Sequence, residues 1–127
     1  MAKTIATLLG VVFILVGLLG FVMPGLLGAH LDPAHNVVHL VTGAVALYLG
    51  LKGSLSAAKM FCLIFGAVYL LLGVVGFVAG DGPERMLDLA NVLHFGTVDH
   101  IIHILLGGIF IIGGLMTGGP AIASAVD

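Results

Sequence analysis

Residues 57–79, AAKMFCLIFGAVYLLLGVVGFVA, form an apolar run whose one charged side chain, Lys59, lies near its beginning. A helix needs about 20 such residues to cross the ~30 Å hydrocarbon core of a bilayer. Three further runs have similar length and composition: residues 4–23, 33–51 and 99–116. The backbone finds no water to bond inside a bilayer, so each run is expected to be helical despite its many Gly, Val and Ile residues. The sequence therefore predicts an all-α membrane protein with four transmembrane helices.

The overall composition supports the same fold class. Of the 127 residues, 61% are hydrophobic and 8% are charged, whereas soluble domains average about 25% charged residues. The formal net charge is −2 and there are only four basic residues, so we expect no nucleic-acid partner. The single cysteine, Cys62, excludes a disulfide within the chain. The length suits a single domain comprising residues 1–127.

The chain contains an internal repeat. Residues 10–22 (GVVFILVGLLGFV) match residues 66–78 (GAVYLLLGVVGFV) at an offset of 56, with three glycines, a Phe and two valines in common. Residues 39–51 match residues 103–115 at an offset of 64, through a His, two glycines and a Leu. Matches of Gly and His at fixed spacing indicate a repeated two-helix unit, since they are rarer by chance than matches of apolar residues.

The repeat predicts how the helices are arranged. Each unit, about residues 4–51 and about residues 57–116, contains two membrane crossings, so both units enter from the same side. We therefore expect parallel repeats related by a pseudo-two-fold axis along the membrane normal. The first run, preceded by Lys3, also resembles a signal peptide with a cleavage site at residues 27–29. Because that run has a partner in the second repeat, we interpret it as a retained helix.

The basic residues predict the orientation. With four alternating crossings, one side carries three of the four basic residues, Lys3, Lys52 and Lys59. The other side carries all six histidines and most of the acidic residues. Basic residues concentrate on the cytoplasmic side of membrane proteins, so both termini are expected to be cytoplasmic.

Capping signals refine the helix boundaries. Asp32 followed by Pro33 is typical of a helix start, and Asp99 can cap the fourth helix in the same way. Residues 81–84 (DGPE) resemble a capping box. The positions that follow at helical spacing are Met86, Leu87, Ala90, Leu93 and His94. This pattern predicts a short amphipathic helix, residues 83–94, on the outer surface before the fourth helix; an irregular loop is the alternative.

Small residues and hydroxyls indicate how the helices pack. Glycines recur every seven residues in all four runs, as Gly10 and Gly17, Gly43 and Gly50, Gly66, Gly73 and Gly80, and Gly107 and Gly114. Lipid is as apolar as a leucine side chain, so close packing at such residues holds membrane helices together. We expect helix packing at Gly17, Gly43, Gly50, Gly73, Gly107 and Gly114, or alternatively a flat slot for a ring-shaped cofactor. Tyr69 and Thr42 lie near mid-membrane, and their hydroxyls should find hydrogen-bond partners within the bundle.

The histidines form the candidate site. The repeat makes His39 and His103 equivalent, and polar neighbours accompany them: Asn36, Asp99 and His100. We interpret these five residues as an interhelical polar clasp in which His39 bonds to His103 and Asp99 orients His103. Two alternatives remain: a Zn or Cu site, and axial ligation of haem or a chlorophyll-type pigment by His39 and His103. The metal site would use His35, His39, His100 and His103.

Enzyme signatures are missing from the sequence. It has no G-x-S-x-G motif, P-loop or H-E-x-x-H motif, so we expect no catalytic residues and no cofactor. The favoured function is a non-enzymatic membrane protein, acting as an interaction or accessory subunit among other membrane proteins. A small transporter is less favoured, because no charged residue lies deep within any run.

Three segments carry a resemblance to a known family. They are residues 36–43 (NVVHLVTG), 65–76 (FGAVYLLLGVVG) and 99–107 (DHIIHILLG). Over roughly residues 4–115 the chain resembles a bacterial family of small four-helix membrane proteins labelled domain of unknown function 4383. The resemblance implies a four-helix protein of a bacterial inner or cytoplasmic membrane. It implies no assigned activity and supplies no functional residues.

Overall fold

The computed structural model describes residues 1–118. It contains four helices that are long and apolar enough to cross a membrane: α1 (Ala2–Val22), α2 (Pro33–Lys52), α3 (Leu55–Ala79) and α4 (Thr97–Leu115). Each boundary lies within two residues of the run seen in the sequence. The prediction of an all-α, four-helix integral membrane protein is confirmed.

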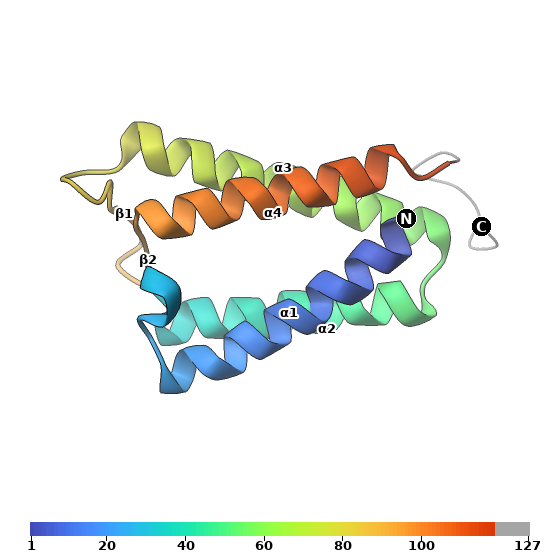
Figure 1. The fold of residues 1–127 in the computed structure, drawn as a ribbon, viewed down its shortest axis with the longest axis horizontal. Coiled ribbons are helices and arrows are strands. Elements are labelled where there is room, and N and C mark those ends of the chain that lie inside the picture. The colour runs from blue at the N-terminus through green and yellow to red at the C-terminus, as the bar shows by residue number, and fades with distance from the viewer. Residues whose placement is uncertain (119–127) are drawn as a thin grey trace.

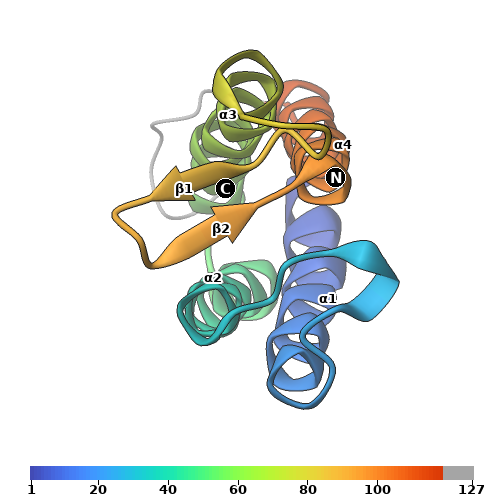
Figure 2. The same cartoon turned by 90° about the vertical axis from the view of Figure 1, so that its left-hand side faces the viewer.

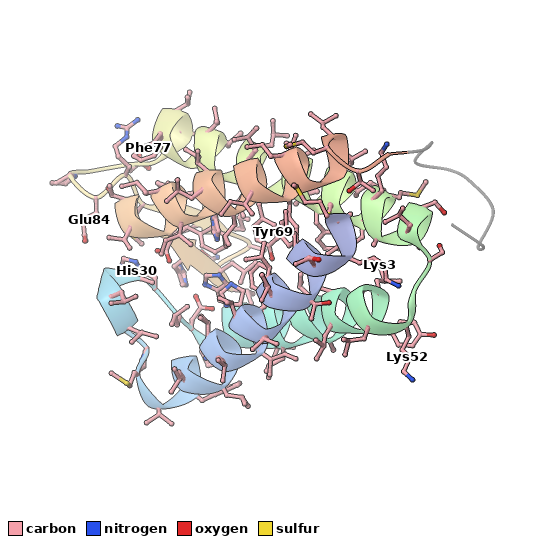
Figure 3. All side chains as sticks on the ribbon, turned by 45° about the vertical axis from the view of Figure 1, so that its right-hand side comes forward. Lys3, His30, Lys52, Tyr69, Phe77 and Glu84 are labelled. Carbon is pink, nitrogen blue, oxygen red and sulfur yellow. The ribbon has the colours of Figure 1, made fainter. Side chains whose placement is uncertain are left out.

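The four helices form two hairpins. α1 packs mainly against α2, and α3 mainly against α4 (Figure 1). Both hairpins begin at the same end of the molecule, so the two repeats are parallel. Lys3 and Lys52 lie at this end (Figure 3), which we call the lysine end. His30 and Glu84 lie at the opposite end, which we call the histidine end.

Equivalent glycines lie at equivalent helix crossings. A Cβ atom on Gly43 of α2 would come within 2.9 Å of the Gly10 carbonyl oxygen of α1. In the other hairpin, a Cβ on Gly107 of α4 would come within 2.7 Å of the Gly66 carbonyl oxygen of α3. The remaining glycines named from the sequence also face the partner helix, Gly17 and Gly50 in the first hairpin and Gly73 and Gly114 in the second. These glycines let the backbones touch, which is how helices pack closely in lipid.

The equivalence extends to two polar side chains. A Cβ on Gly20 of α1 would overlap the amide of Asn36, and a Cβ on Gly76 of α3 would overlap the ring of His100. Asn36 and His100 occupy the same position in the two repeats, 64 residues apart. Each hairpin thus houses one polar side chain in a notch made by a glycine near the histidine end.

The prediction of an outer helix over residues 83–94 is wrong. This segment contains an antiparallel hairpin of β1 (Leu87–Leu89) and β2 (Leu93–Phe95), which lies across the histidine end (Figure 2). Ala90 and Asn91 both have positive φ, 54° and 56°, and the Val92 amide donates to the Leu89 carbonyl at 3.0 Å. These features define a tight hairpin turn, and Asn tolerates the left-handed conformation. The apolar residues alternate with Asp88 and His94, which is the two-residue period of a strand.

Aromatic rings join the two hairpins in the middle of the bundle. The ring centroid of Phe13 on α1 lies 5.5 Å from that of Tyr69 on α3 and 6.1 Å from that of Phe110 on α4. Phe61 of α3 packs edge-on against Phe110 at 5.7 Å. Figure 3 shows Tyr69 in the interior between the hairpins. These rings fill the centre of the core, so polar groups near the histidine end are separated from the lysine end.

The lysine end is closed by small residues and satisfied hydrogen bonds. Ala2, Ala6 and Ala58 have no exposed surface, which allows α1 to approach α3 closely. The Ala2 amide donates to the Thr117 hydroxyl at 2.8 Å, and this hydroxyl donates to the Gly113 carbonyl at 2.6 Å. Thr117 therefore anchors the beginning of α1 to the end of α4.

Candidate functional site

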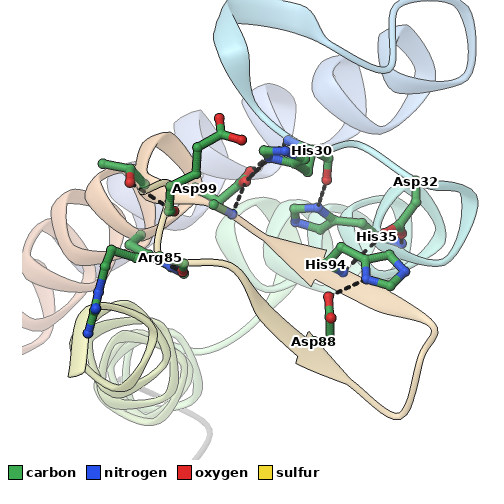
Figure 4. Close-up of polar contacts among 11 residues, drawn as sticks. His30, Asp32, His35, Arg85, Asp88, His94 and Asp99 are labelled. Atoms are coloured by element: carbon green, nitrogen blue, oxygen red, sulfur yellow. Dashed lines mark hydrogen bonds and ion pairs between the residues drawn. The ribbon is translucent and has the colours of Figure 1, made fainter. Parts of the chain in front are cut away.

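Asp99 joins the two hairpins at the histidine end. Its carboxylate is 2% exposed and accepts hydrogen bonds from the backbone amide of His30 at 3.0 Å and from His30 Nδ1 at 2.9 Å (Figure 4). It also accepts from the Gly96 amide at 2.8 Å, because α4 begins at Thr97 and Asp99 lies in its first turn. The expectation that Asp99 orients His103 is wrong. The carboxylate instead anchors the loop that follows α1.

Asp32 makes a second connection at this end. Its side chain accepts from the His35 amide at 2.9 Å and caps α2, with Pro33 at the first helical position, as the sequence predicted. The other carboxylate oxygen accepts from the His94 amide of β2 at 3.2 Å. Asp32 therefore fixes the β-hairpin to the beginning of α2 (Figure 4).

His100 is a structural residue of the second hairpin. Its Nε2 donates to the Arg85 carbonyl at 2.7 Å, and its ring lies against Gly76 and Phe77 of α3. The Arg85 guanidinium donates to the carbonyls of Phe77 and Val78 at the end of α3. His100 therefore lies apart from the other histidines proposed as metal ligands, and Arg85 is engaged with backbone.

Three other histidines come together between the hairpins. We call His35, His39 and His103 the histidine cluster; they are 3%, 6% and 2% exposed. The ring centroid of His35 lies 4.1 Å from that of His39 and 5.8 Å from that of His103. Phe95 of β2 packs edge-on against His35 at 4.9 Å and against His103 at 5.0 Å. The β-hairpin therefore covers the histidine cluster from the outside.

The cluster is incompletely hydrogen-bonded. His35 Nδ1 donates to the His30 carbonyl at 2.9 Å, so its Nε2 carries a free lone pair. Nδ1 of His39 and Nδ1 of His103 are buried, and neither has a partner among the described residues. The expected hydrogen bond between His39 and His103 does not form, and the ring of His35 lies beside both of them. The polar clasp is thus made by Asp99 with His30 and by Asp32 with His94.

Asn36, the fifth residue of the expected clasp, belongs to the first hairpin. Its side-chain amide donates to the Leu31 carbonyl at 3.3 Å. Its Oδ1 is buried without a partner in the part of the chain that the structure describes. Asn36 contributes to the α1–α2 contact at Gly20, and it is not part of the histidine cluster.

Two small cavities flank the histidine cluster, and all three rings line both. The first, about 110 Å³, lies between α1 and α4 beneath residues 26–31. The second, about 140 Å³, lies between α2 and α3 beneath the β-hairpin. Tyr69 and Thr42 also line the second cavity. Both side chains are buried inside the bundle rather than exposed to lipid.

The arrangement determines which ligands fit. Among residues 1–118, no three His, Cys, Asp or Glu side chains are placed to hold one metal ion. The proposed set of four histidines is not assembled, since His100 faces α3. Each cavity is also well below the ~300 Å³ of pockets that hold drug-sized ligands, and a porphyrin is larger still. Each cavity has room only for a small molecule.

Several of these features had no signal in the sequence. His30 and Asp99 are 69 residues apart, and no motif connects them. Phe95 directly follows residues 83–94, the segment for which the sequence predicts a surface helix. The two-residue alternation around Asp88 and His94 was the available sign of a hairpin.

Comparison with known proteins gives one match. The family Domain of unknown function (DUF4383) matches residues 25–116, which is more than half of the chain and includes α2, α3, α4 and the histidine cluster. No curated protein and no solved structure matches the chain. The chain belongs to the DUF4383 family, and it is a small four-helix membrane protein.

Proposed function

We propose that this protein is a non-enzymatic membrane protein that binds a small molecule at the histidine cluster. The observation that carries the proposal is the pair of buried Nδ1 atoms, on His39 and His103, that have no partner in residues 1–118. They come from equivalent positions of the two repeats and lie beside two cavities. Both side chains line the two cavities, so a small molecule bound in either one would contact their rings.

The energetic cost of the cluster supports a binding role. A buried polar group without a partner costs about 1–3 kcal/mol, and apolar side chains of similar size would avoid that cost. Natural proteins accept such local costs mainly at functional sites. Within residues 1–118, Oδ1 of Asn36 and Nδ1 of His100 are also buried without a partner but line neither cavity. The position of His39 and His103 beside the cavities is therefore what favours a ligand.

The surroundings of the cluster favour binding over catalysis. The nearby carboxylate of Asp99 already accepts hydrogen bonds from His30 and Gly96. The thiol of Cys62 is buried near Ala2, at the lysine end, and donates to the Ala2 carbonyl at 3.7 Å. Within residues 1–118, the Asp99 carboxylate is thus already hydrogen-bonded and the Cys62 thiol lies at the other end, so neither forms a catalytic pair with the histidines.

The proposal is tested by what the protein carries from native membranes. Solvent extracts of the purified protein are compared by mass spectrometry between the wild type and the double variant His39→Leu/His103→Leu. An absorption spectrum and metal analysis of the same samples cover coloured cofactors and metals. We expect a small molecule in the wild type that the double variant lacks.

The matched control is His94→Leu, which removes an imidazole from the partly exposed surface of β2. This variant should retain the extracted molecule. Identical extracts from the wild type and the double variant would contradict a binding role for the histidine cluster. If the wild type instead carries a metal or a chromophore that the double variant lacks, the ligand belongs to one of those classes.

A second candidate function is that of an accessory subunit of a larger membrane complex. Gly108 of α4 points away from the bundle, and a Cβ there would meet nothing within 4 Å. Large exposed apolar residues surround it on the same helix face: Ile101, Leu105, Ile112 and Leu115. Because Gly108 has no side chain, it leaves a notch in this face, and the notch allows close approach of a helix from another subunit. Gly108→Leu should abolish co-purification of a partner in mild detergent, and co-purification that survives this change would contradict contact at the notch.

We also propose that the lysine end faces the cytoplasm of a bacterial inner membrane. Lys52 ends α2 and Lys59 lies in the first turns of α3, so the basic residues gather at the end where both hairpins begin. In a Cys62→Ala background, Asp88→Cys should react with an impermeant maleimide on intact cells. Ser54→Cys should react only after lysis, and the reverse pattern would contradict this orientation.

A further inference from the structure

The two cavities beside the histidine cluster occupy equivalent places in the two repeats. The first lies between α1 and α4, and the second lies between α2 and α3. Each therefore fills a seam where one hairpin meets the other. Three residues of α1 and three of α3, paired at the 56-residue offset of the repeat, line the cavities: Val12 and Val68, Phe13 and Tyr69, and Val16 and Leu72.

The walls from α2 and α4 are equivalent as well. Two residues of α2 that line the second cavity have equivalents in α4, 64 positions later, that line the first: Val38 and Ile102, and Thr42 and Leu106. Protein interiors contain few voids larger than a water molecule, and a local packing defect has no reason to recur in two sequences that differ. The agreement along all four helices therefore indicates that the pair of cavities is built into the repeated unit.

The surface of each cavity is almost wholly carbon. This holds for the second cavity although Tyr69 and Thr42 line it. The unpaired Nδ1 atoms of His39 and His103 have almost no accessible surface, so these rings present carbon to the cavities. A water molecule needs two to four polar partners, and a polar ligand group without partners costs free energy. Both cavities therefore favour an apolar occupant.

The size of the cavities restricts this occupant to about one ring. Their volumes are about 110 and 140 Å³, and an engineered apolar cavity of about 150 Å³ stays dry and binds benzene or xenon. Atoms that line an empty space lack dispersion contacts on one side, and a ligand restores those contacts. This gain remains when the ligand arrives from lipid, where transfer between apolar surroundings contributes little. Fused rings and macrocycles exceed the available space.

The surroundings of both cavities point to entry from the lipid. Helices of different hairpins touch far less than helices of the same hairpin. Val12 and Val68, an equivalent pair that lines the two cavities, are 44% and 54% exposed on the membrane-facing surface. The water-facing sides are covered, the first by residues 26–31 and the second by the β-hairpin through Phe95. A ligand therefore reaches each cavity from the bilayer, which requires that it be soluble in lipid.

We infer that the two cavities are a pair of equivalent binding sites for small apolar molecules dissolved in the bilayer, of the class of single-ring or short branched hydrocarbons. This inference rests on the proposed binding function and specifies the ligand class of that site. One molecule occupies each seam between the hairpins and contacts the carbon atoms of the histidine rings. A fully loaded protein therefore holds two molecules.

The test uses fluorobenzene as an apolar probe and 4-fluorophenol as its polar counterpart. Binding to the protein in lipid nanodiscs is measured by fluorine NMR, with empty nanodiscs correcting for partition into lipid. We expect two bound fluorobenzene molecules per chain, with fluorine–proton Overhauser contacts to the methyl groups of Val12 and Val68. We expect 4-fluorophenol to bind about tenfold more weakly after the same correction, because a carbon-lined cavity leaves its hydroxyl unpaired.

Matched variants test the two sites separately. Val12→Phe narrows the mouth of the first cavity, and Val68→Phe narrows that of the second. Each variant should bind one fluorobenzene molecule with the affinity of the untouched site, which also shows that the variant is folded. Val11→Phe places the same ring at a neighbouring position that is 43% exposed and lines neither cavity, and it should bind two molecules. A wild type that binds one molecule or none, or that binds 4-fluorophenol as tightly as fluorobenzene, would overturn the inference.

The outcomes separate this inference from the proposed function. If the extract contains a histidine-dependent molecule but fluorobenzene does not bind, the proposed function stands and the inference about the ligand class fails. If fluorobenzene fills both cavities but the extracts of the wild type and the His39→Leu/His103→Leu variant are identical, the cavities bind apolar molecules and the proposed function fails. If the extracts are identical and fluorobenzene does not bind, both fail.

Discussion

The lysine end and the histidine end are built from the same repeated hairpin, but they are packed in opposite ways. At the lysine end, Ala2, Ala46 and Cys62 have no exposed surface, and the Ala2 amide is satisfied by Thr117. At the histidine end, the space between the hairpins holds three imidazoles and two cavities. Nδ1 of His39 and of His103 remains unpaired there.

The difference shows where this fold makes room for a ligand. Small side chains let the hairpins touch at the lysine end, and the interface closes around Phe61 and Phe110. At the other end, Asp99 and Asp32 accept hydrogen bonds from the connecting segments, and these bonds tie the hairpins together across the space. The site is thus created by how the hairpins are joined, while the glycine crossings within each hairpin are the same throughout.

The largest effect is expected from a change at the glycine crossings, which both ends of the molecule share. In Gly107→Leu, the new side chain would overlap the backbone of Leu70 and Gly66, whose nearest atoms lie 2.5 and 2.7 Å from the Cβ position. Overpacking of a core costs typically 1–3 kcal/mol, and a backbone cannot move aside easily. We expect a loss of about 3 kcal/mol in the free energy of unfolding, measured by steric trapping in bicelles.

The control for this change is the next residue along the helix. Gly108→Leu places the same side chain where a Cβ meets nothing within 4 Å, and we expect a change below about 0.5 kcal/mol. Similar losses of unfolding free energy in Gly107→Leu and Gly108→Leu would show that helix propensity, rather than the glycine crossing, governs stability.

The second prediction concerns the connection between the hairpins at the histidine end. Asp99→Ala leaves the amides of His30 and Gly96 without their acceptor, and hydrogen bonds to charged groups are worth about 1.5–3 kcal/mol. We expect a loss of about 2 kcal/mol in the free energy of unfolding. Hydrogen exchange of amides in residues 26–31 should increase more than that of amides in α3.

Asp88→Ala is the matched change at an exposed carboxylate of β1 that pairs with His94. Exposed ion pairs contribute about 0–1 kcal/mol, so this variant should remain close to the wild type. If Asp99→Ala were equally mild, the Asp99 carboxylate would contribute little to holding the two hairpins together.

The third prediction probes those rings. Phe110 has no exposed surface and contacts Phe13, Tyr69 and Phe61. Phe→Ala changes in soluble cores cost about 3–5 kcal/mol, but part of that cost is transfer to water, which does not apply in lipid. We expect Phe110→Ala to cost about 2 kcal/mol in a bicelle unfolding assay. A loss near zero would mean that the lysine half is no better packed than the histidine half.

The smallest expected effect is the pH dependence of the β-hairpin. The hydrogen bond from His94 to Asp88 raises the pKa of His94 above its ordinary value of 6.5. Because the folded pKa is raised, the pair stabilises the hairpin fully below about pH 6.5 and loses this contribution as the pH rises through the folded pKa. Chemical shifts of β1 and β2 should report a small loosening in that range, and His94→Gln should abolish it.

The sequence predicts those features that local patterns determine. The four spans follow from hydrophobic length, and the start of α2 follows from Asp32 and Pro33. The Gly and His spacing indicated the repeat, and Thr42 and Tyr69 lie inside the bundle as expected. Each of these inferences needs only the periodicity of one helix or the equivalence of two repeats.

The sequence does not predict contacts that depend on how the loops fold. Residues 83–94 fit a helical pattern by spacing, but the left-handed turn at Ala90 and Asn91 makes them a hairpin. Because the first connecting loop places His30 over the fourth helix, Asp99 bonds to His30 rather than to His103. His35 lies beside both His39 and His103, and the hydrogen bond that the equivalence of His39 and His103 suggested does not form.

The most direct test of the binding account is the stability of the ligand-free protein after His39→Leu. Leucine has nearly the volume of histidine, and the change removes one unpaired buried Nδ1. We expect the free energy of unfolding in ligand-free bicelles to rise by about 1 kcal/mol, the lower end of the cost of an unsatisfied buried polar group. A loss of 1 kcal/mol or more would show that the imidazole already makes its stabilising contacts, and would contradict a site that awaits a ligand.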